Sequence, residues 1–351
     1  MKSTYKSGEV EILLKDVTGL VEPLGTEERE QKIQAGTHYC EMLPLEYKPS
    51  LNYMEAYRAA MEGFGRTTAL AVGVVAEKIY GAKGKDGVLV SLARAGIPAG
   101  VLVRRYLKNK YHAELSHYAI SIIRDRGIDH NALNYILKRH KPGQIQFIDG
   151  WVGKGAIYRE LKKALRDRPD IDPVLAVLSD PANLTPLCGT HEDILIPSSC
   201  LNATVTGLIS RTFLRSDVIG EEDFHGAAFY RELQQEDLTN SYLDEIERSF
   251  DYEAAAGETE SGVPGMEVVR NIAGSYGIDN LNLIKPGIGE STRVLLRRTP
   301  WKLLITPKSG STGELRHLLE LAEEKQVPVE ASRTDLGAYK ACGLIKKAAD
   351  A

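Results

Sequence analysis

The segment 149–155 reads Asp-Gly-Trp-Val-Gly-Lys-Gly and combines an acid, three glycines and a lysine. Glycines let several backbone N–H groups converge on one point, and Lys154 would add a full positive charge there. The apolar run 145–148 predicts a buried parallel strand before this turn, and residues 156–165 predict a helix after it. Because the N-terminal end of a helix attracts anions, this order of elements predicts a phosphate-binding turn. The alternative is a plain strand-to-helix connection.

Two further turns carry arginines. The first contains Arg94 and lies between a strand predicted over 88–92 and a helix predicted over 101–107. The second, residues 124–126, reads Arg-Asp-Arg and follows a strand predicted over 117–123. Cations in these positions could stabilise an anionic leaving group. The alternatives are a plain connection at the first turn and solvated arginines at the second.

The cysteines and histidines allow a different chemistry. The four cysteines show no Cys-x-x-Cys or Cys/His ligand spacing, so we expect reduced thiols in a cytoplasmic protein. A cysteine hydrolase would use Cys40 or Cys200 as its nucleophile and His38 or His225 as its base. No recognisable protease signature surrounds either cysteine.

These turns belong to a regular alternation of predicted strands and helices. A long helix is predicted over 52–78, further strands over 174–178 and 194–196, and another helix over 200–213. Such alternation predicts an α/β fold with a doubly wound parallel sheet, which binds ligands at the carboxyl ends of its strands. The predicted strands end near four charged residues that one crevice could gather: Arg94, Asp125, Asp149 and Asp180.

An acidic, glycine-bearing segment predicts two domains. We interpret residues 251–265 as a linker between a first domain over 1–250 and a small α/β domain over 266–351. In the second domain a strand predicted over 303–307 precedes a helix predicted over 314–325.

Composition is compatible with this division. With 351 residues, of which 43% are hydrophobic and 26% charged, the chain can bury two cores. The net charge of −4 argues against a general nucleic-acid-coating surface and leaves a local basic patch open. No apolar run approaches the roughly 18 residues of a membrane span, so we expect no membrane contact.

The turns at 93–96 and 149–155 resemble the pyrophosphate and sugar-phosphate loops of type I phosphoribosyltransferases. This resemblance implies a Mg²⁺-dependent transfer between phosphoribosyl pyrophosphate, or a nucleotide-like metabolite, and a base-like acceptor. It implies catalytic roles for Asp149, Arg124 and Arg126. It implies substrate contacts for Arg94, Ala95, Gly96, Gly150, Trp151, Gly153, Lys154, Gly155 and Asp180.

The second domain resembles the Pelota/L7Ae RNA-binding fold. Its loop 287–293, Gly-Ile-Gly-Glu-Ser-Thr-Arg, corresponds to the Gly-x-Asn-Glu-x-x-Lys loop of that family and implies a structured RNA partner. RNA contacts are implied for Gly287, Gly289, Glu290, Arg293 and Arg297. As a whole the chain resembles bacterial phosphoribosyltransferase-like proteins from tellurite-resistance and stress gene clusters, a family also labelled StiP cysteine proteases. A cysteine hydrolase and a non-catalytic nucleotide sensor therefore remain alternatives to the transferase.

Overall fold

A computed structural model describes residues 1–253, 262–306 and 313–346. We call residues 1–253 the first unit and residues 262–346 the C-terminal unit. Most of the expected linker, residues 254–261, lies outside the described residues. The domain boundaries expected from the sequence therefore stay a prediction.

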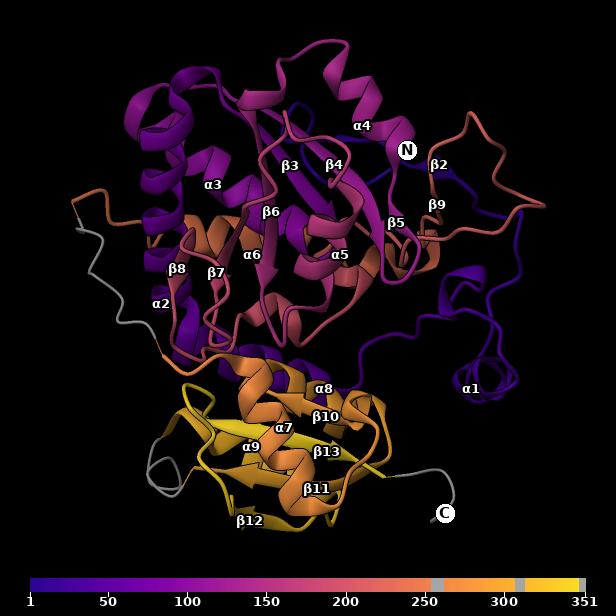
Figure 1. Cartoon of the computed structure of the whole chain (residues 1–351), viewed down its shortest axis with the longest axis vertical. Helices are drawn as coiled ribbons and strands as arrows, with labels where there is room; N and C mark the ends of the chain where they lie inside the picture. Colours follow the sequence, from indigo (N-terminus) through magenta and orange to yellow (C-terminus); the bar gives the residue numbers. More distant parts are fainter. Residues whose placement is uncertain (254–261, 307–312, 347–351) are drawn as a thin grey trace.

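A parallel sheet forms the centre of the first unit (Figure 1). Its strands run in the spatial order β1-β4-β3-β6-β7-β8, every neighbouring pair is parallel, and the short β5 pairs antiparallel with β4. In chain order they are β1 (Glu11–Ile12), β3 (Val88–Ala93), β4 (Ser116–Ile123), β5 (Gly127–Ile128), β6 (Ile145–Trp151), β7 (Leu175–Ser179) and β8 (Cys188–Thr190). The expected α/β fold with a parallel sheet is confirmed.

Helices cover both faces of this sheet, because its central strands are apolar on both sides. Residues of α2 (Leu51–Lys83), α3 (Gly96–Tyr111) and α6 (Thr239–Glu247) share one hydrophobic core. Residues of α4 (His130–Leu137) and α5 (Ala156–Ala164) belong to a second core on the other face. Within the described residues, no helix is both long and apolar enough to cross a membrane.

The amino-terminal residues extend beside this body. Helix α1 (Thr26–Gln34) stands apart from the sheet in Figure 1, and a short 3₁₀ turn, η1 (Tyr39–Glu41), follows it. A two-stranded ribbon of β2 (Lys15–Asp16) and β9 (Gly226–Ala227) ties the amino-terminal segment to the end of the first unit.

The C-terminal unit is a small α/β unit with a mixed sheet in the order β10-β13-β11-β12. Only the β11–β12 pair is parallel. Its elements are α7 (Gly265–Tyr276), β10 (Ile284–Pro286), α8 (Ile288–Arg297), β11 (Pro300–Ile305), α9 (Arg316–Glu324), β12 (Val329–Ala331) and β13 (Ala341–Ile345).

The C-terminal unit packs against the carboxyl ends of the parallel strands (Figure 1). Both hydrophobic cores contain residues of both units, for example Phe64 with Leu318 and Val177 with Val268. The main chain also bonds across the boundary, since the Gly265 N–H donates to the Ala182 carbonyl at 2.9 Å. The edge of the sheet where ligands were expected is therefore largely a contact between the units.

Three sequence predictions of elements are wrong. Residues 194–196 are buried but form no strand, because β8 already occupies the edge of the sheet six residues earlier. Residues 200–213 form no long helix, since Gly207 and Leu208 both adopt positive φ and interrupt any helical run. Helix α3 begins at Gly96 instead of residue 101.

Candidate functional site

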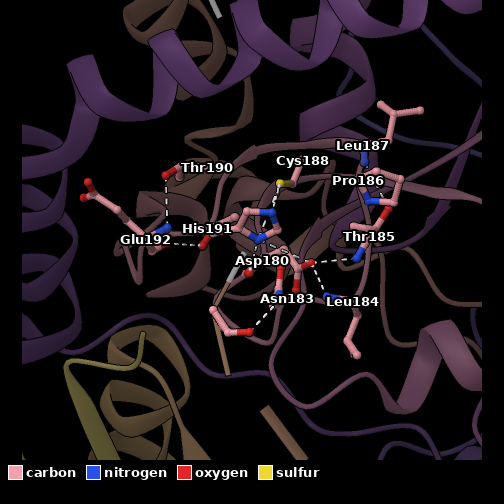
Figure 2. A network of polar contacts seen from close by, with 12 residues as sticks. Asp180, Asn183, Leu184, Thr185, Pro186, Leu187, Cys188, Thr190, His191 and Glu192 are labelled. Atoms are coloured by element: carbon pink, nitrogen blue, oxygen red, sulfur yellow. Dashed lines mark hydrogen bonds and ion pairs between the residues drawn. The ribbon is translucent and has the colours of Figure 1, made fainter. Parts of the chain in front are cut away.

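Cys188, His191 and Asp180 lie together at the carboxyl ends of β7 and β8. Asp180 directly follows β7, and β8 begins at Cys188 and ends one residue before His191. The His191 Nδ1 atom lies 2.8 Å from the main-chain oxygen of Asp180, and the Cys188 Sγ atom lies 3.4 Å from Nε2. Figure 2 shows the imidazole between the sulfur and the Asp180 turn. The three side chains are those of a cysteine-nucleophile triad.

The turn after Asp180 is rigidly held. One carboxylate oxygen of Asp180, Oδ2, accepts the N–H groups of Leu184 at 2.6 Å and Thr185 at 2.8 Å. The other oxygen, Oδ1, is buried and has no hydrogen-bond partner among the described residues. Burial raises the pKa of Asp180, and the two N–H groups oppose that rise. The carboxylate thus has one oxygen left for a further donor.

The contacts of His191 indicate which ring nitrogen carries the proton. Since Nδ1 lies within hydrogen-bond distance of a carbonyl oxygen, we assign the proton to Nδ1 and the lone pair to Nε2. The sulfur of Cys188 is 3.7 Å from Nδ1 as well as 3.4 Å from Nε2, so it does not lie along the Nε2 lone pair. Rotation of the ring is needed to aim Nε2 at the thiol. The Asp180 Oδ2 atom, 3.8 Å from Nδ1, can hold the ring after that rotation.

Burial dominates the state of the thiol. Cys188 has no exposed surface, and burial raises its pKa to about 11 although Lys78 opposes the rise. The ground state at neutral pH is therefore a neutral thiol beside an imidazole, and a base must remove the thiol proton during attack. The His191 side chain retains 15% of its exposure, so the imidazole is the member of the cluster nearest to solvent.

A second cysteine–histidine pair lies in the amino-terminal segment. The Cys40 Sγ atom is 2.9 Å from His38 Nδ1, so these two residues are in contact. Nδ1 also accepts the Cys40 N–H at 3.4 Å, and the buried Nε2 has no partner among the described residues. Burial raises the pKa of the Cys40 thiol to about 11. This pair has the shorter contact, but no acid or carbonyl oxygen among the described residues is hydrogen-bonded to its ring.

Cys200 and His225, the other predicted nucleophile and base, are not brought together. Cys200 lies in the hydrophobic core, where its thiol donates to the Ala56 carbonyl at 3.7 Å. The His225 Nδ1 atom lies 2.8 Å from the hydroxyl of Ser121, which is a residue of β4. The two side chains therefore serve local structure.

The glycine-rich turn 149–155 contacts the C-terminal unit instead of lying open. The Lys154 ammonium donates to the carbonyls of Leu281 at 2.5 Å and Ile284 at 3.2 Å, and burial lowers its pKa to about 8. The Gly153 carbonyl accepts the Tyr339 hydroxyl at 2.7 Å. The lysine that was expected to face a phosphate therefore donates to carbonyl oxygens of the protein.

Asp149 and Gly150 lie at the start of this turn. The Asp149 carboxylate accepts the Gly150 N–H at 2.8 Å, and burial raises its pKa to about 7. Trp151 and Gly153 line a small cavity between the units, and Gly155 begins α5 with φ of +79°.

The predicted arginines are engaged by acids or by the main chain. Arg94 pairs with Glu46 at 3.0 Å and donates to the Ile209 carbonyl at 2.7 Å. Ala95 and Gly96 form the N-terminal end of α3. Arg124 lies over the Tyr39 ring, 5.7 Å from its centroid, and Arg126 pairs with Glu41 at 2.9 Å.

The loop predicted to bind RNA also faces the first unit. The φ of Gly287 is +100°, and a Cβ atom there would lie 3.2 Å from the Asp193 carboxylate. A Cβ on Gly289 would meet the Ser199 hydroxyl at 3.3 Å, and Glu290 pairs with Arg293 at 2.9 Å beside Trp151. The side chain of Arg297 lies outside the described part of the chain.

The expectation that the cysteines show no Cys/His spacing is wrong, because residues 188–191 read Cys-Gly-Thr-His. This segment starts eight residues after Asp180, on the adjacent parallel strand. Of the three residues, only Asp180 was predicted as a site residue. Parallel neighbours end on the same edge, so this spacing brings the three side chains together.

Comparison with known proteins matches nearly all of the chain. Residues 3–247 match the family described as tellurite-like stress resistance cysteine protease StiP, and residues 263–347 match the PELOTA RNA binding domain. The cysteine protease StiP of Acinetobacter baylyi is 35% identical over 371 residues, which cover 98% of this chain and 94% of the relative.

Solved structures give only distant matches. A xanthine-guanine-hypoxanthine phosphoribosyltransferase of Helicobacter pylori is 22% identical with a TM-score of 0.23, over 30% of this chain and 67% of that one. A hypothetical protein of Neisseria gonorrhoeae with bound ppGpp is 16% identical with a TM-score of 0.24, over 36% of this chain and 68% of that one. Similarity at this level carries no functional argument.

These findings correct the functional prediction. The interpretation as a Mg²⁺-dependent phosphoribosyltransferase is wrong, because the family match and the relative both carry a cysteine protease name. The cysteine alternative has the better support. Among the described residues no group of three or more His, Cys, Asp or Glu side chains could hold a metal ion, and Mg²⁺ stays an untested prediction of the resemblance.

Proposed function

Because the chain belongs to the StiP family of tellurite-like stress resistance cysteine proteases, we propose that it hydrolyses peptide bonds with Cys188 as nucleophile. His191 is the general base, and Asp180 orients it. The observation that supports this choice is the position of the His191 imidazole, whose Nε2 lies 3.4 Å from Sγ and whose Nδ1 lies 2.8 Å from the Asp180 main-chain oxygen. Among the described residues, no acid or carbonyl oxygen is hydrogen-bonded to the ring of His38.

The chemistry follows from these contacts. His191 Nε2 takes the thiol proton while Sγ bonds to the substrate carbonyl carbon, and the same proton then goes to the leaving amine as the C–N bond breaks. Water activated by Nε2 hydrolyses the thioester and restores the thiol. Asp180 stabilises the imidazolium during both steps, because its main-chain oxygen accepts from Nδ1 and its carboxylate oxygen Oδ2 lies 3.8 Å from the same nitrogen.

Access to the thiol involves the boundary between the units. Ser179 and Pro181, which flank Asp180, line the small cavity together with Asp193 and Glu290. A substrate that enters there reaches the Asp180 turn first. Cys188 itself is fully buried, so turnover includes an opening motion at this edge.

Thiol mapping tests the assignment. A peptidyl thiol-alkylating inhibitor is expected to abolish hydrolysis of labelled casein and to modify Cys188 once per chain, because a substrate-like reagent is captured by the nucleophile. Digestion and mass spectrometry of the inhibited protein identify the modified cysteine. Modification of Cys40 with Cys188 left free would contradict the assignment.

A second function, RNA binding by the C-terminal unit, is supported by the match of residues 263–347 to an RNA-binding domain. The loop 287–293 faces the first unit, so we propose a different contact surface around Trp301 on β11. Trp301 is 36% exposed, and the Lys302 ammonium lies 5.3 Å from its ring centroid. An exposed ring beside a cation is suited to stacking on an unpaired base.

Trp301→Ala is therefore expected to weaken RNA binding by roughly tenfold, because one base–aromatic stack contributes about 1–3 kcal/mol. Fluorescence anisotropy with a labelled RNA hairpin measures the affinity. Val329→Ala is the matched control, since Val329 is 40% exposed on the neighbouring β12 but has no ring to stack. Equal affinities for both variants and the unmodified protein would rule out Trp301 as an RNA contact.

A further inference from the structure

Asp193 is a buried acid that joins the two units. Its residue is 3% exposed, and its carboxylate oxygens both lie 3.0 Å from the Ile288 N–H at the start of α8. One of them also accepts the Lys340 N–H at 2.9 Å. Burial raises the pKa of Asp193 to about 6, and these N–H groups oppose the rise. The acid belongs to the first unit, whereas all of its donors belong to the C-terminal unit.

Asp193 is also close to the proposed general base along the chain. Only Glu192 separates it from His191, and this short segment is held at several points. The Glu192 N–H donates to the Thr190 hydroxyl at 3.0 Å, and the Ser179 hydroxyl donates to the Glu192 carbonyl at 2.9 Å. Hydrogen bonds thus hold the segment 190–193 to β8, to β7 and to the C-terminal unit.

We propose that the C-terminal unit is part of the catalytic site, because it fixes the position of His191 through Asp193. This inference rests on the proposed function, and it assigns Asp193 as a positioning residue that acts through His191. His191 must rotate to aim Nε2 at Cys188, and the end of its segment is set by α8 and by residue 340. Because a misplacement of about 1 Å can cost roughly a hundredfold in rate, this anchor bears directly on proton transfer.

A purely structural role for Asp193 makes a different prediction. If the acid only held the units together, its loss would change stability and leave the chemistry of folded molecules unchanged. The proposal instead requires a fall in kcat with little change in KM, and a slower reaction of the Cys188 thiol with a small reagent. The two roles are therefore separable in one set of variants.

The test uses the full chain with Asp193→Ala and, from the other side of the contact, Gly287→Ala. An added methyl group at residue 287 meets the Asp193 carboxylate at 3.2 Å in a backbone conformation of φ +100° that disfavours alanine. Both variants are expected to lower kcat on labelled casein at least tenfold. Both should also slow the alkylation of Cys188 by iodoacetamide and change how the rate of that alkylation depends on pH.

Two further variants complete the design. Glu192→Ala is the matched control, since its side chain is 71% exposed and makes only a 3.9 Å ion pair with Lys340. Asp193→Asn keeps an acceptor oxygen for the N–H groups and should recover part of the rate. If Asp193→Ala does not fold, Asp193→Asn takes its place in the test. The proposal is overturned if the folded Asp193 variants and Gly287→Ala match Glu192→Ala in both readouts. The alkylation rate needs no peptide hydrolysis, so a failure of the proposed protease activity would be recognised separately.

Discussion

Replacing Cys188 by alanine is expected to lower kcat for peptide hydrolysis by about 10⁴-fold or more, since no other atom of the cluster can form the thioester. The fold should survive, because the change removes one buried sulfur beside His191 and leaves the Asp180 turn intact. Progress curves with labelled casein measure the activity. Circular dichroism confirms that the variant is folded.

Cys40→Ala provides the comparison for this prediction. It removes an equally buried thiol that also lies beside a histidine, and the pKa of each thiol is raised to about 11. Activity is expected to persist in this variant, because no acceptor among the described residues binds the Nε2 atom of His38. The reverse pattern, with activity lost in Cys40→Ala and kept in Cys188→Ala, would move the active site to the amino-terminal segment.

Gly189→Ala is expected to destabilise the fold strongly, with a decrease of about 3 kcal/mol or more in the free energy of unfolding. A Cβ atom at this position would lie 2.6 Å from the Ala71 carbonyl oxygen and 2.7 Å from the Leu178 carbonyl oxygen. Both are backbone atoms of α2 and β7, so no flexible side chain can yield. Urea denaturation at equilibrium measures the change.

Gly81→Ala is the matched control, because Gly81 lies in the same helix α2 and no atom lies within 4 Å of a Cβ built there. A helical glycine in open space should gain about 0.5–1 kcal/mol of stability when it becomes alanine. If Gly189→Ala were as stable as the unmodified protein, α2 could not pack on β8 as described.

Local sequence patterns predicted the strands at the centre of the sheet but not β8 at its edge. The run 145–148 and the long pattern 52–78 are strongly apolar or strongly periodic, and they became β6 and α2. The run 194–196 is equally apolar but forms no strand, because strand formation also needs a free neighbour. Which edge of a sheet is already paired is a property of the whole fold that no local window contains.

The candidate site was harder to predict, because one set of residue types serves two purposes. Glycines and a lysine at a helix start suit a phosphate, and they suit the carbonyl oxygens of another unit equally well. Lys154 donates to two such carbonyls. Its partners, Leu281 and Ile284, are more than 120 residues away in the chain, so nothing near the glycine-rich turn indicated them.

The contact of Asp193 with the start of α8 limits how genes of this kind can recombine. An exchange of the C-terminal segment between two relatives would bring together an acid from one parent and a helix start from the other. The lack of a side chain at Gly287 leaves room for the Asp193 carboxylate, since a Cβ atom there would lie 3.2 Å from it. Lys154 and Tyr339 make further contacts between the same two units. Crossovers between these positions are therefore expected to be selected against, and substitutions on either side should co-vary along lineages.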